Sequence, residues 1–327
     1  MSEQSALPAI CLMGPTASGK TELALRLAGT MPAEIISVDS ALVYRGMDIG
    51  TAKPDANTLG RYPHHLLDIR DPEQSYSAGE FVRDATAEIA GIRASGRIPL
   101  LVGGTMMYFR ALTRGIARLP PADPSVRASI DAEAAASGWQ AMHRKLALAD
   151  PAAAGRIGTN DSQRIQRALE VYLISSRPLS DWQADASSDR PLAASLHFLK
   201  LGLIPEPRAE LHRRIEERLR QMLDSGFVEE VRSLRRRHRL TSRSPSMRAV
   251  GYRQIWSYLE GQCGLDEAVD RALAATRQLA KRQLTWLRSE PGLYVVNPLE
   301  PQVFATIQSV VGKHLNEQGS IGHMDST

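Results

Sequence analysis

Cysteine is scarce in this chain of 327 residues, which has only Cys11 and Cys263. Cys11 lies in an apolar run and Cys263 in a turn beside glycines. Two isolated cysteines argue against a disulfide framework and a cysteine zinc site, and they fit a reducing, cytoplasmic compartment. No apolar run approaches the ~20 residues of a membrane span. The first residues carry no basic region, so we expect neither a membrane span nor a secretory signal.

A strong charge of one sign is also missing, because 40 basic and 36 acidic residues leave a net charge of only +4. The excess is local. Five basic residues and no acid lie between Arg271 and Arg288, and thirteen arginines face seven acids between Glu206 and Arg253. This distribution is typical of a nucleic-acid contact in the C-terminal half. A solvated helical face, or general arginine richness, explains the same pattern, since only six of the basic residues are lysine.

A glycine-containing loop, GPTASGKT at residues 14–21, follows the apolar run 9–13 and precedes leucines at helical spacing. Strand, loop and helix are the context that a phosphate-binding loop requires, whereas an ordinary glycine-rich turn is the alternative. Its backbone N–H groups can point at an anion, and the helix N-terminus adds positive potential. We predict phosphate binding by all eight residues, with Thr21 also a magnesium ligand: Gly14, Pro15, Thr16, Ala17, Ser18, Gly19, Lys20 and Thr21.

Strands and helices alternate on both sides of a long helical stretch. Strands are predicted at 9–13, 34–38, 64–68, 98–102, 198–203 and 293–296, and the main helices at 20–29, 77–95, 106–112, 209–223, 227–237, 265–287 and 302–314. This alternation predicts an α/β fold with a parallel sheet. Only helical patterns occur from 123 to about 189, so we expect an all-helical insertion. The predicted parts are a core at 1–120, the insertion at 121–196, the rest of the core at 197–315 and a disordered tail at 316–327.

Asp39 directly follows the second predicted strand. Ligands of open α/β sheets bind beyond the carboxyl ends of strands, so Asp39 is expected to face the same crevice as the loop. A magnesium ligand, a general base and a helix N-cap are the three possible roles. Thr105 follows the strand at 98–102, where many P-loop NTPases carry a magnesium-binding carboxylate. The lack of that acid argues against an ATP hydrolase, and the Thr105 hydroxyl can instead donate to a phosphate or cap a helix.

Three further groups each have a functional and an ordinary interpretation. His64 and His65 face opposite sides of a strand, so they cannot both bind one metal, and hydrogen-bonded histidines are expected. Arg214 and Arg218 share a helix face and can clamp a diphosphate or lie in solvent. The segment 160–167 opens a helix with amides and cations, which suits a nucleic-acid surface or, equally, solvent.

Taken together, these blocks resemble the tRNA dimethylallyltransferase family, also called isopentenyl-tRNA transferases, from about residue 9 to 290. The blocks that carry the resemblance are 14–21, 39–40 with 44–54, 102–105, 160–171, 214–218, 250–253 and 281–286. The resemblance implies a P-loop nucleoside-kinase-like core whose helical insertion embraces the tRNA anticodon arm. It also implies a magnesium-assisted reaction that moves a dimethylallyl group from dimethylallyl diphosphate to N6 of the adenosine 3′ of the anticodon.

The same resemblance implies roles for individual residues. Asp39 is the implied general base and Thr105 orients the diphosphate. Contact with tRNA is implied for Asp39, Ser40, Ala41, Leu42, Thr105, Arg127, Gln163, Arg164, Ile165, Gln166, Arg167, Arg248, Gly251, Arg253, Lys281, Arg282 and Gln283. Nothing in the sequence indicates an obligate dimer, so a monomer is expected. The alternatives are a P-loop kinase for a small molecule or nucleoside, with Asp39 as its base, and a nucleic-acid-binding NTPase.

Overall fold

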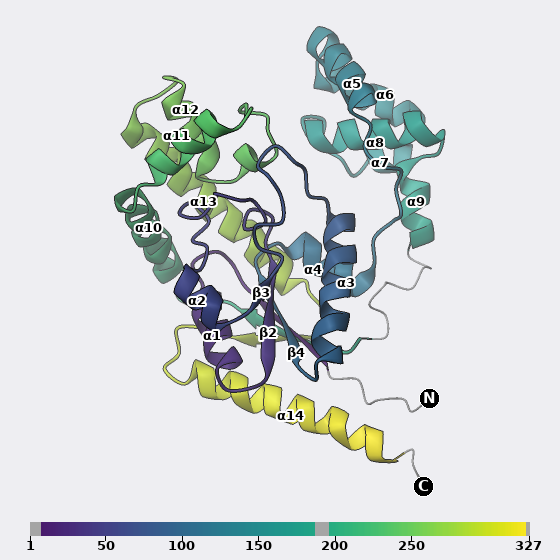
Figure 1. Ribbon diagram of the computed structural model, residues 1–327. Helices are drawn as coiled ribbons and strands as arrows, with labels where there is room; N and C mark the ends of the chain where they lie inside the picture. The colour runs from purple at the N-terminus through teal and green to yellow at the C-terminus, as the bar shows by residue number, and fades with distance from the viewer. Residues whose placement is uncertain (1–7, 187–195, 325–327) are drawn as a thin grey trace. The chain divides into compact units, whose positions relative to one another are not determined.

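A computed structural model describes residues 8–186 and 196–324 (Figure 1). The chain divides into two compact units. Unit 1 combines residues up to Arg110 with those from Ser195 onward, and unit 2 is the intervening stretch Ala111–Ala194. The division falls inside a helix, α4 (Met106–Arg114), whereas the sequence placed the first boundary at 121. In the described ranges, no helix is both long and apolar enough to cross a membrane.

Unit 1 is built on one six-stranded sheet in which every neighbouring pair is parallel, as predicted. The strand order is β3-β2-β4-β1-β5-β6. The strands are β1 (Ala9–Met13), β2 (Ala33–Val38), β3 (His64–His65), β4 (Ile98–Gly103), β5 (Phe198–Leu203) and β6 (Leu293–Val296). Gly103 is in register with both Met13 and Val38. The ends of β1, β2 and β4 therefore lie side by side, and the segments that follow them start from one edge.

Strand β3 is shorter than the predicted 64–68. Leu66 and Asp68 have φ angles of 63° and 53°, in the left-handed region that a strand cannot use. The histidines themselves are hydrogen-bonded, as expected. His64 Nδ1 lies 2.7 Å from the Tyr62 carbonyl, and the two ring nitrogens of His65 each lie 2.7 Å from a carboxylate, of Glu34 and of Glu88.

Unit 1 also contains most of the helices. They are α1 (Lys20–Ala28), α2 (Ala56–Arg61), α3 (Ala78–Ala94), the first part of α4, α10 (Arg208–Asp224), α11 (Phe227–Arg237), α12 (Tyr252–Leu259), α13 (Leu265–Arg288) and α14 (Val303–Met324), with a short 3-10 turn at Ser246–Arg248. The predicted capping box of α3 is present, because Ser77 accepts from Glu80 N and Glu80 accepts from Ser77 N. Helices α2 and α12 were not predicted, and α14 continues to Met324 instead of ending near His314 before a disordered tail.

Among the apolar clusters in the described part of unit 1, two bear on the loops that follow the strands. The first joins the strands to α1 and α14 through buried residues such as Leu12, Leu27, Leu100 and Ile307. The second joins the loop that contains Val43 and Met47 to α11 and α12, through side chains that include Phe227, Val231, Tyr252 and Ile255. Figure 1 shows α11 and α12 packed together away from the strands, with α13 running from them toward the sheet. The second cluster therefore fixes a loop that follows β2.

Unit 2 is all-helical over its described residues, as the sequence predicted. Its helices are α5 (Pro124–Ser137), α6 (Trp139–Ala149), α7 (Pro151–Ala154), α8 (Ser162–Ser175) and α9 (Leu179–Ala186), preceded by the end of α4. Ile130, Met142, Leu146 and Leu169 belong to its buried core. Glu170, one residue along α8 from this core, is also completely buried, so unit 2 must satisfy a carboxylate inside its own fold.

Candidate active site

The loop between β1 and α1 begins at the edge where three strands end. Gly14 N donates to Gly103 O at 3.2 Å, which ties the loop to the end of β4. Ala17 and Gly19 have φ angles of 61° and 84°, so the backbone turns through left-handed positions before α1 starts at Lys20. A side chain on Gly14 would come within 2.7 Å of the buried Ser18 hydroxyl. The loop thus has the turned backbone and the helix N-terminus that an anion-binding loop needs.

Lys20 is held inside this loop, with Nζ donating to Pro15 O at 2.5 Å. Burial and, to a smaller extent, the charge of Arg218 together lower the pKa of Lys20 to about 7, while Asp39 opposes the shift. A bound anion would favour the protonated ammonium, since an opposite charge stabilises the charged form. Binding of an anion is therefore expected to increase the positive charge on Lys20.

Two arginines of α10 lie toward the same loop. Arg218 Nη2 donates to Thr51 O at 3.0 Å, and burial lowers the pKa of Arg218 while Asp39 raises it. Arg214 Nη1 lies 3.9 Å from the point where a Cβ on Gly19 would stand, and Arg214 Nε bonds Glu210 Oε1 at 3.1 Å. The charges of Lys20, Arg214 and Arg218 are thus gathered at the loop, and Arg218 is not part of a solvated face.

Asp39 combines two of its predicted roles. Its Oδ1 accepts from Ala41 N at 2.8 Å and from Leu42 N at 3.3 Å, which is the capping geometry. Among the residues that the structure describes, Oδ2 accepts no hydrogen bond. Thr105 stands beside it, because its hydroxyl oxygen accepts from Ser40 N at 3.2 Å. One carboxylate oxygen therefore fixes the turn and the other remains available as a base or ligand, while the Thr105 hydroxyl hydrogen has no acceptor among the described residues.

The turn-rich loop 44–54 is held by side chains that the sequence did not single out. Lys53, with a side chain 4% exposed, donates to Tyr44 O at 3.0 Å and pairs with Asp48 and Asp68. Glu230 of α11 accepts from three consecutive backbone N–H groups, those of residues 48–50, and from the Tyr252 hydroxyl. These bonds place Thr51 O in front of Arg218. A loop with many turns and no periodic pattern needs side chains elsewhere to hold its backbone. This lack of periodicity was the feature of the sequence that could have indicated such partners.

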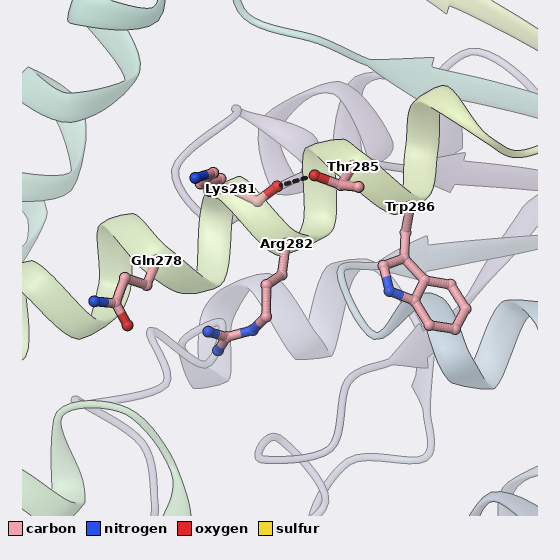
Figure 2. Close-up of a pocket in the computed structure, with 5 residues that line it drawn as sticks. All are labelled: Gln278, Lys281, Arg282, Thr285 and Trp286. Carbon is pink, nitrogen blue, oxygen red and sulfur yellow. Dashed lines mark hydrogen bonds between the residues drawn. The ribbon is translucent and has the colours of Figure 1, made fainter. Parts of the chain in front are cut away.

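Helix α13 presents an open basic face (Figure 2). A cavity of about 300 Å³ is lined by Gln278, Lys281, Arg282, Thr285 and Trp286. The Arg110 guanidinium lies 5.6 Å from the Trp286 ring centroid. Within the described part of the chain, Lys281 and Arg282 have no ion-pair partner. Exposed cations beside an aromatic ring are the chemistry that single-stranded RNA contacts use.

Gln283 differs from these neighbours on α13. Its Oε1 accepts from Thr16 N at 3.0 Å, and its Nε2 donates to Gly104 O at 2.8 Å. Gln283 was expected among the residues that contact tRNA. The structure instead directs its amide toward the phosphate loop.

Some of the other residues expected on a tRNA surface are exposed, and others make hydrogen bonds within the protein. Arg164, Gln163, Arg248 and Arg253 are exposed. Gly251 is buried with a φ angle of 92° and donates its N–H to Gln254 Oε1, so its place is explained by the start of α12. Gln166 bonds Asp131 at 2.6 Å.

Three further residues that were expected on the tRNA surface make contacts inside unit 2. Ile165 is 0% exposed in the core of the unit, so its side chain cannot touch RNA. Arg127 and Arg167 both bind the buried Glu170, at 2.8 and 2.6 Å, and Arg167 also donates to Pro120 O. Although burial by itself raises the pKa of Glu170, hydrogen bonds from Arg127 and Arg167 outweigh it and lower that pKa. These two arginines neutralise a buried charge.

The residues present fit a magnesium ion that is held largely by the phosphate oxygens of a bound diphosphate. In the described ranges, no cluster of three or more His, Cys, Asp or Glu side chains could hold a metal. Magnesium on a diphosphate needs only one or two protein ligands, because phosphate oxygens and water complete its shell. Thr21, exposed in the first turn of α1, and the free oxygen of Asp39 are suitable donors.

Sheet, loop and helical insertion define a P-loop α/β protein. A family model described as IPP transferase matches residues 42–290. The tRNA dimethylallyltransferase of Thiobacillus denitrificans is 56% identical over 308 residues, covering 94% of this chain and 97% of the relative. That of Ralstonia pickettii is 52% identical, covering 97% and 98%. The chain therefore belongs to the family of tRNA dimethylallyltransferases, or IPP transferases.

Solved structures agree. The tRNA isopentenylpyrophosphate transferase of Bacillus halodurans superposes with a TM-score of 0.70 at 35% identity, covering 97% of this chain and 99% of that one. A eukaryotic dimethylallyltransferase acting on tRNA matches with a TM-score of 0.75 over 92% of this chain and 77% of that one, and at 24% identity it shows the fold alone. The comparisons give no support to a kinase.

Proposed function

We propose that this chain transfers the dimethylallyl group of dimethylallyl diphosphate to N6 of the adenosine 3′ of the anticodon in tRNA. The observation that carries the proposal is that Asp39 follows β2 at the edge of the sheet where the phosphate loop follows β1, so that its carboxylate also acts on the pKa values of Lys20 and Arg218. A base and a diphosphate site in electrostatic contact suit a substitution in which diphosphate leaves. Membership of the transferase family supports the same chemistry.

The leaving group defines what the loop does. Breaking the bond between the allylic carbon and oxygen leaves negative charge on the diphosphate. The N–H groups of the loop, Lys20, Arg214 and Arg218 are arranged to stabilise that charge. Magnesium, held by Thr21, would neutralise further charge on the same oxygens. Residues 14–21 therefore bind the diphosphate in this proposal.

The nucleophile defines what Asp39 does. The lone pair of the exocyclic amine of adenine is delocalised into the ring, so the amine attacks weakly unless a base accepts its proton. A positioned carboxylate typically contributes about 10²–10⁴-fold. Thr105 fixes the turn at Ser40 through its hydroxyl oxygen and can orient the diphosphate with its hydrogen. The adenine must leave its stack to reach a base so close to the sheet edge.

Several exposed or partly exposed groups are proposed to bind the anticodon arm. In unit 1 these are the turn residues Ser40, Ala41 and Leu42 and the cations Arg248, Arg253, Lys281 and Arg282, and in unit 2 Gln163 and Arg164. Phosphate contacts of this kind position the RNA. The scarcity of cysteine and the absence of any sign of an obligate dimer support a cytoplasmic monomer.

The proposal is tested by mass spectrometry of nucleosides from unmodified tRNA after incubation with the protein, magnesium and dimethylallyl diphosphate. We expect N6-dimethylallyladenosine at the position 3′ of the anticodon, and none when that adenosine is replaced by guanosine. Unmodified adenosine after complete incubation would reject the proposed reaction. Phosphorylation of a nucleoside in a parallel assay with ATP would favour the kinase.

A further inference from the structure

Gln283 makes contacts that neither the family resemblance nor the basic face of α13 explains. Its amide joins two segments that start from different strands: Thr16, in the loop after β1, and Gly104, after β4. The two bonds measure 3.0 and 2.8 Å, and the amide satisfies one donor and one acceptor of the backbone.

The position is built tightly around that amide. A Cβ added to Gly104 would lie 2.4 Å from Gln283 Nε2 and 3.1 Å from Gly14 O. Gly104 therefore approaches both the loop and Gln283 with no room for a side chain. The bond from Gln283 reinforces the backbone bond from Gly14 N to Gly103 O, which links the same two segments.

The chemistry of the site depends on the relation of these two segments. The loop carries Lys20 and the N–H groups at the start of α1, whereas the turn after β4 carries Thr105, which holds Ser40 next to Asp39. A shift of one segment against the other would move the base relative to the diphosphate. Misplacement of about 1 Å at a reacting centre can cost about 10²-fold in rate.

We propose that Gln283 is a positioning residue that locks the phosphate loop to the Gly103–Thr105 turn and so sets the distance between the diphosphate and Asp39. It does not itself touch tRNA. Its neighbours Lys281 and Arg282 line the cavity of Figure 2, so one helix carries both the basic face and the lock. The kinetic part of this inference rests on the proposed transfer reaction, and the binding part does not.

The test compares Gln283→Met with Gln308→Met, the same change at an exposed position of α14. Methionine keeps the size of the side chain but makes neither bond. Loss of two hydrogen bonds of ordinary strength should weaken binding of inorganic diphosphate with magnesium, measured by calorimetry, by about 5–30-fold. The turnover number should fall by about tenfold or more. Binding of unmodified tRNA, and the Michaelis constant for it, should stay as in the unsubstituted protein.

Gln308→Met should change none of these quantities. A rise in the Michaelis constant for tRNA with unchanged diphosphate binding would make Gln283 an RNA contact and overturn the inference. Unchanged diphosphate binding and turnover would overturn it as well. If the unsubstituted protein transferred no dimethylallyl group, the proposed function would fail, yet the calorimetric comparison would still decide the role of Gln283.

A double-mutant cycle separates the lock from general damage to the loop. Gly104→Ala must displace the Gln283 amide, so its effect on diphosphate affinity should overlap with that of Gln283→Met. We expect the double variant to bind diphosphate almost as well as the weaker single variant, because the residues share one interaction. Fully additive losses would mean that the two positions act independently and would contradict the lock.

Discussion

Unit 2 and helix α13 of unit 1 both carry the cations that an RNA-binding protein needs, but they use them differently. In unit 2, the partly exposed Arg127 and Arg167 pair with Glu170, whose side chain is 0% exposed, and neutralise it. On α13, Lys281 and Arg282 line an open cavity and have no ion-pair partner among the described residues. Cations of the same charge therefore stabilise a helical unit in one region and remain available to bind RNA in the other.

This difference means that removing a cation changes the free energy of unfolding in one region and the affinity for RNA in the other. A sequence motif does not distinguish the two cases. Removing an arginine that pairs with a buried carboxylate leaves that charge uncompensated and lowers the free energy of unfolding. Removing an exposed, unpaired cation leaves the fold intact and acts on the partner. Four predictions follow this contrast and the site beside it, from the largest expected effect to the smallest.

Replacing both arginines of unit 2, in Arg127→Ala with Arg167→Ala, should have the largest effect. Among the described residues, Glu170 would keep only the N–H of Asp123 as a partner, so the unfolding free energy should fall by about 3 kcal/mol or more. Thermal and urea unfolding measure this loss. Arg164→Ala, at an exposed neighbour, is the matched control. Adding Glu170→Gln should recover part of the stability, and no recovery would show that packing rather than charge is at stake.

The exchange Asp39→Asn should affect chemistry without stability. The amide can still cap the turn through its oxygen, but it cannot accept a proton. We expect the turnover number to fall by about 10²-fold, with little change in tRNA affinity. Single-turnover rates at saturating substrates measure the step. Near-normal turnover would remove Asp39 from the mechanism.

The variant Lys281→Ala with Arg282→Ala should weaken tRNA and leave the melting temperature unchanged. Each lost phosphate contact should reduce the slope of log affinity against log salt by about 0.7–0.9. Titrations of unmodified tRNA at several salt concentrations measure that slope. Dimethylallyl diphosphate affinity is the internal control. A drop in stability with an unchanged slope would place these cations in the same structural class as Arg127.

The pH dependence of diphosphate binding should report on Lys20. Burial lowers its pKa to about 7 in the free protein, so above that pH the side chain is increasingly neutral. A diphosphate favours the ammonium form, and affinity should therefore fall by up to about tenfold per pH unit as pH rises above 7. Calorimetry in buffers of different ionisation enthalpy should show proton uptake. Lys20→Arg, which stays charged, should bind without this slope.

Local pattern was enough to predict much of the fold. Strand β1 and helix α11 begin and end at the predicted residues, because an apolar run and an amphipathic repeat each specify their own element. Strand β3 and helix α12 were harder, since positive φ angles at Leu66 and Gly251 are set by packing around them. Secondary-structure propensity alone does not predict backbone angles that depend on tertiary packing.

The candidate site was predictable only where a motif carries its own chemistry. The loop 14–21 and Asp39 follow from strand ends, which the sequence reveals. The backbone groups that bond Glu230, Gln283 and Glu170 lie 47 to 267 residues away along the chain, from Thr16 to Gln283 at the longest, so no spacing rule connects them. For the same reason Arg127 and Arg164 look alike in sequence, although one pairs with a buried acid and the other is exposed.

The release of diphosphate tests the central claim most directly. In this account, residues 14–21 hold a diphosphate that leaves when a tRNA adenosine attacks beside Asp39. Release of diphosphate should therefore require both substrates. We expect one diphosphate for each dimethylallyladenosine formed, and none when tRNA or dimethylallyl diphosphate is omitted. Release from dimethylallyl diphosphate without tRNA, or product from ATP in its place, would contradict the account.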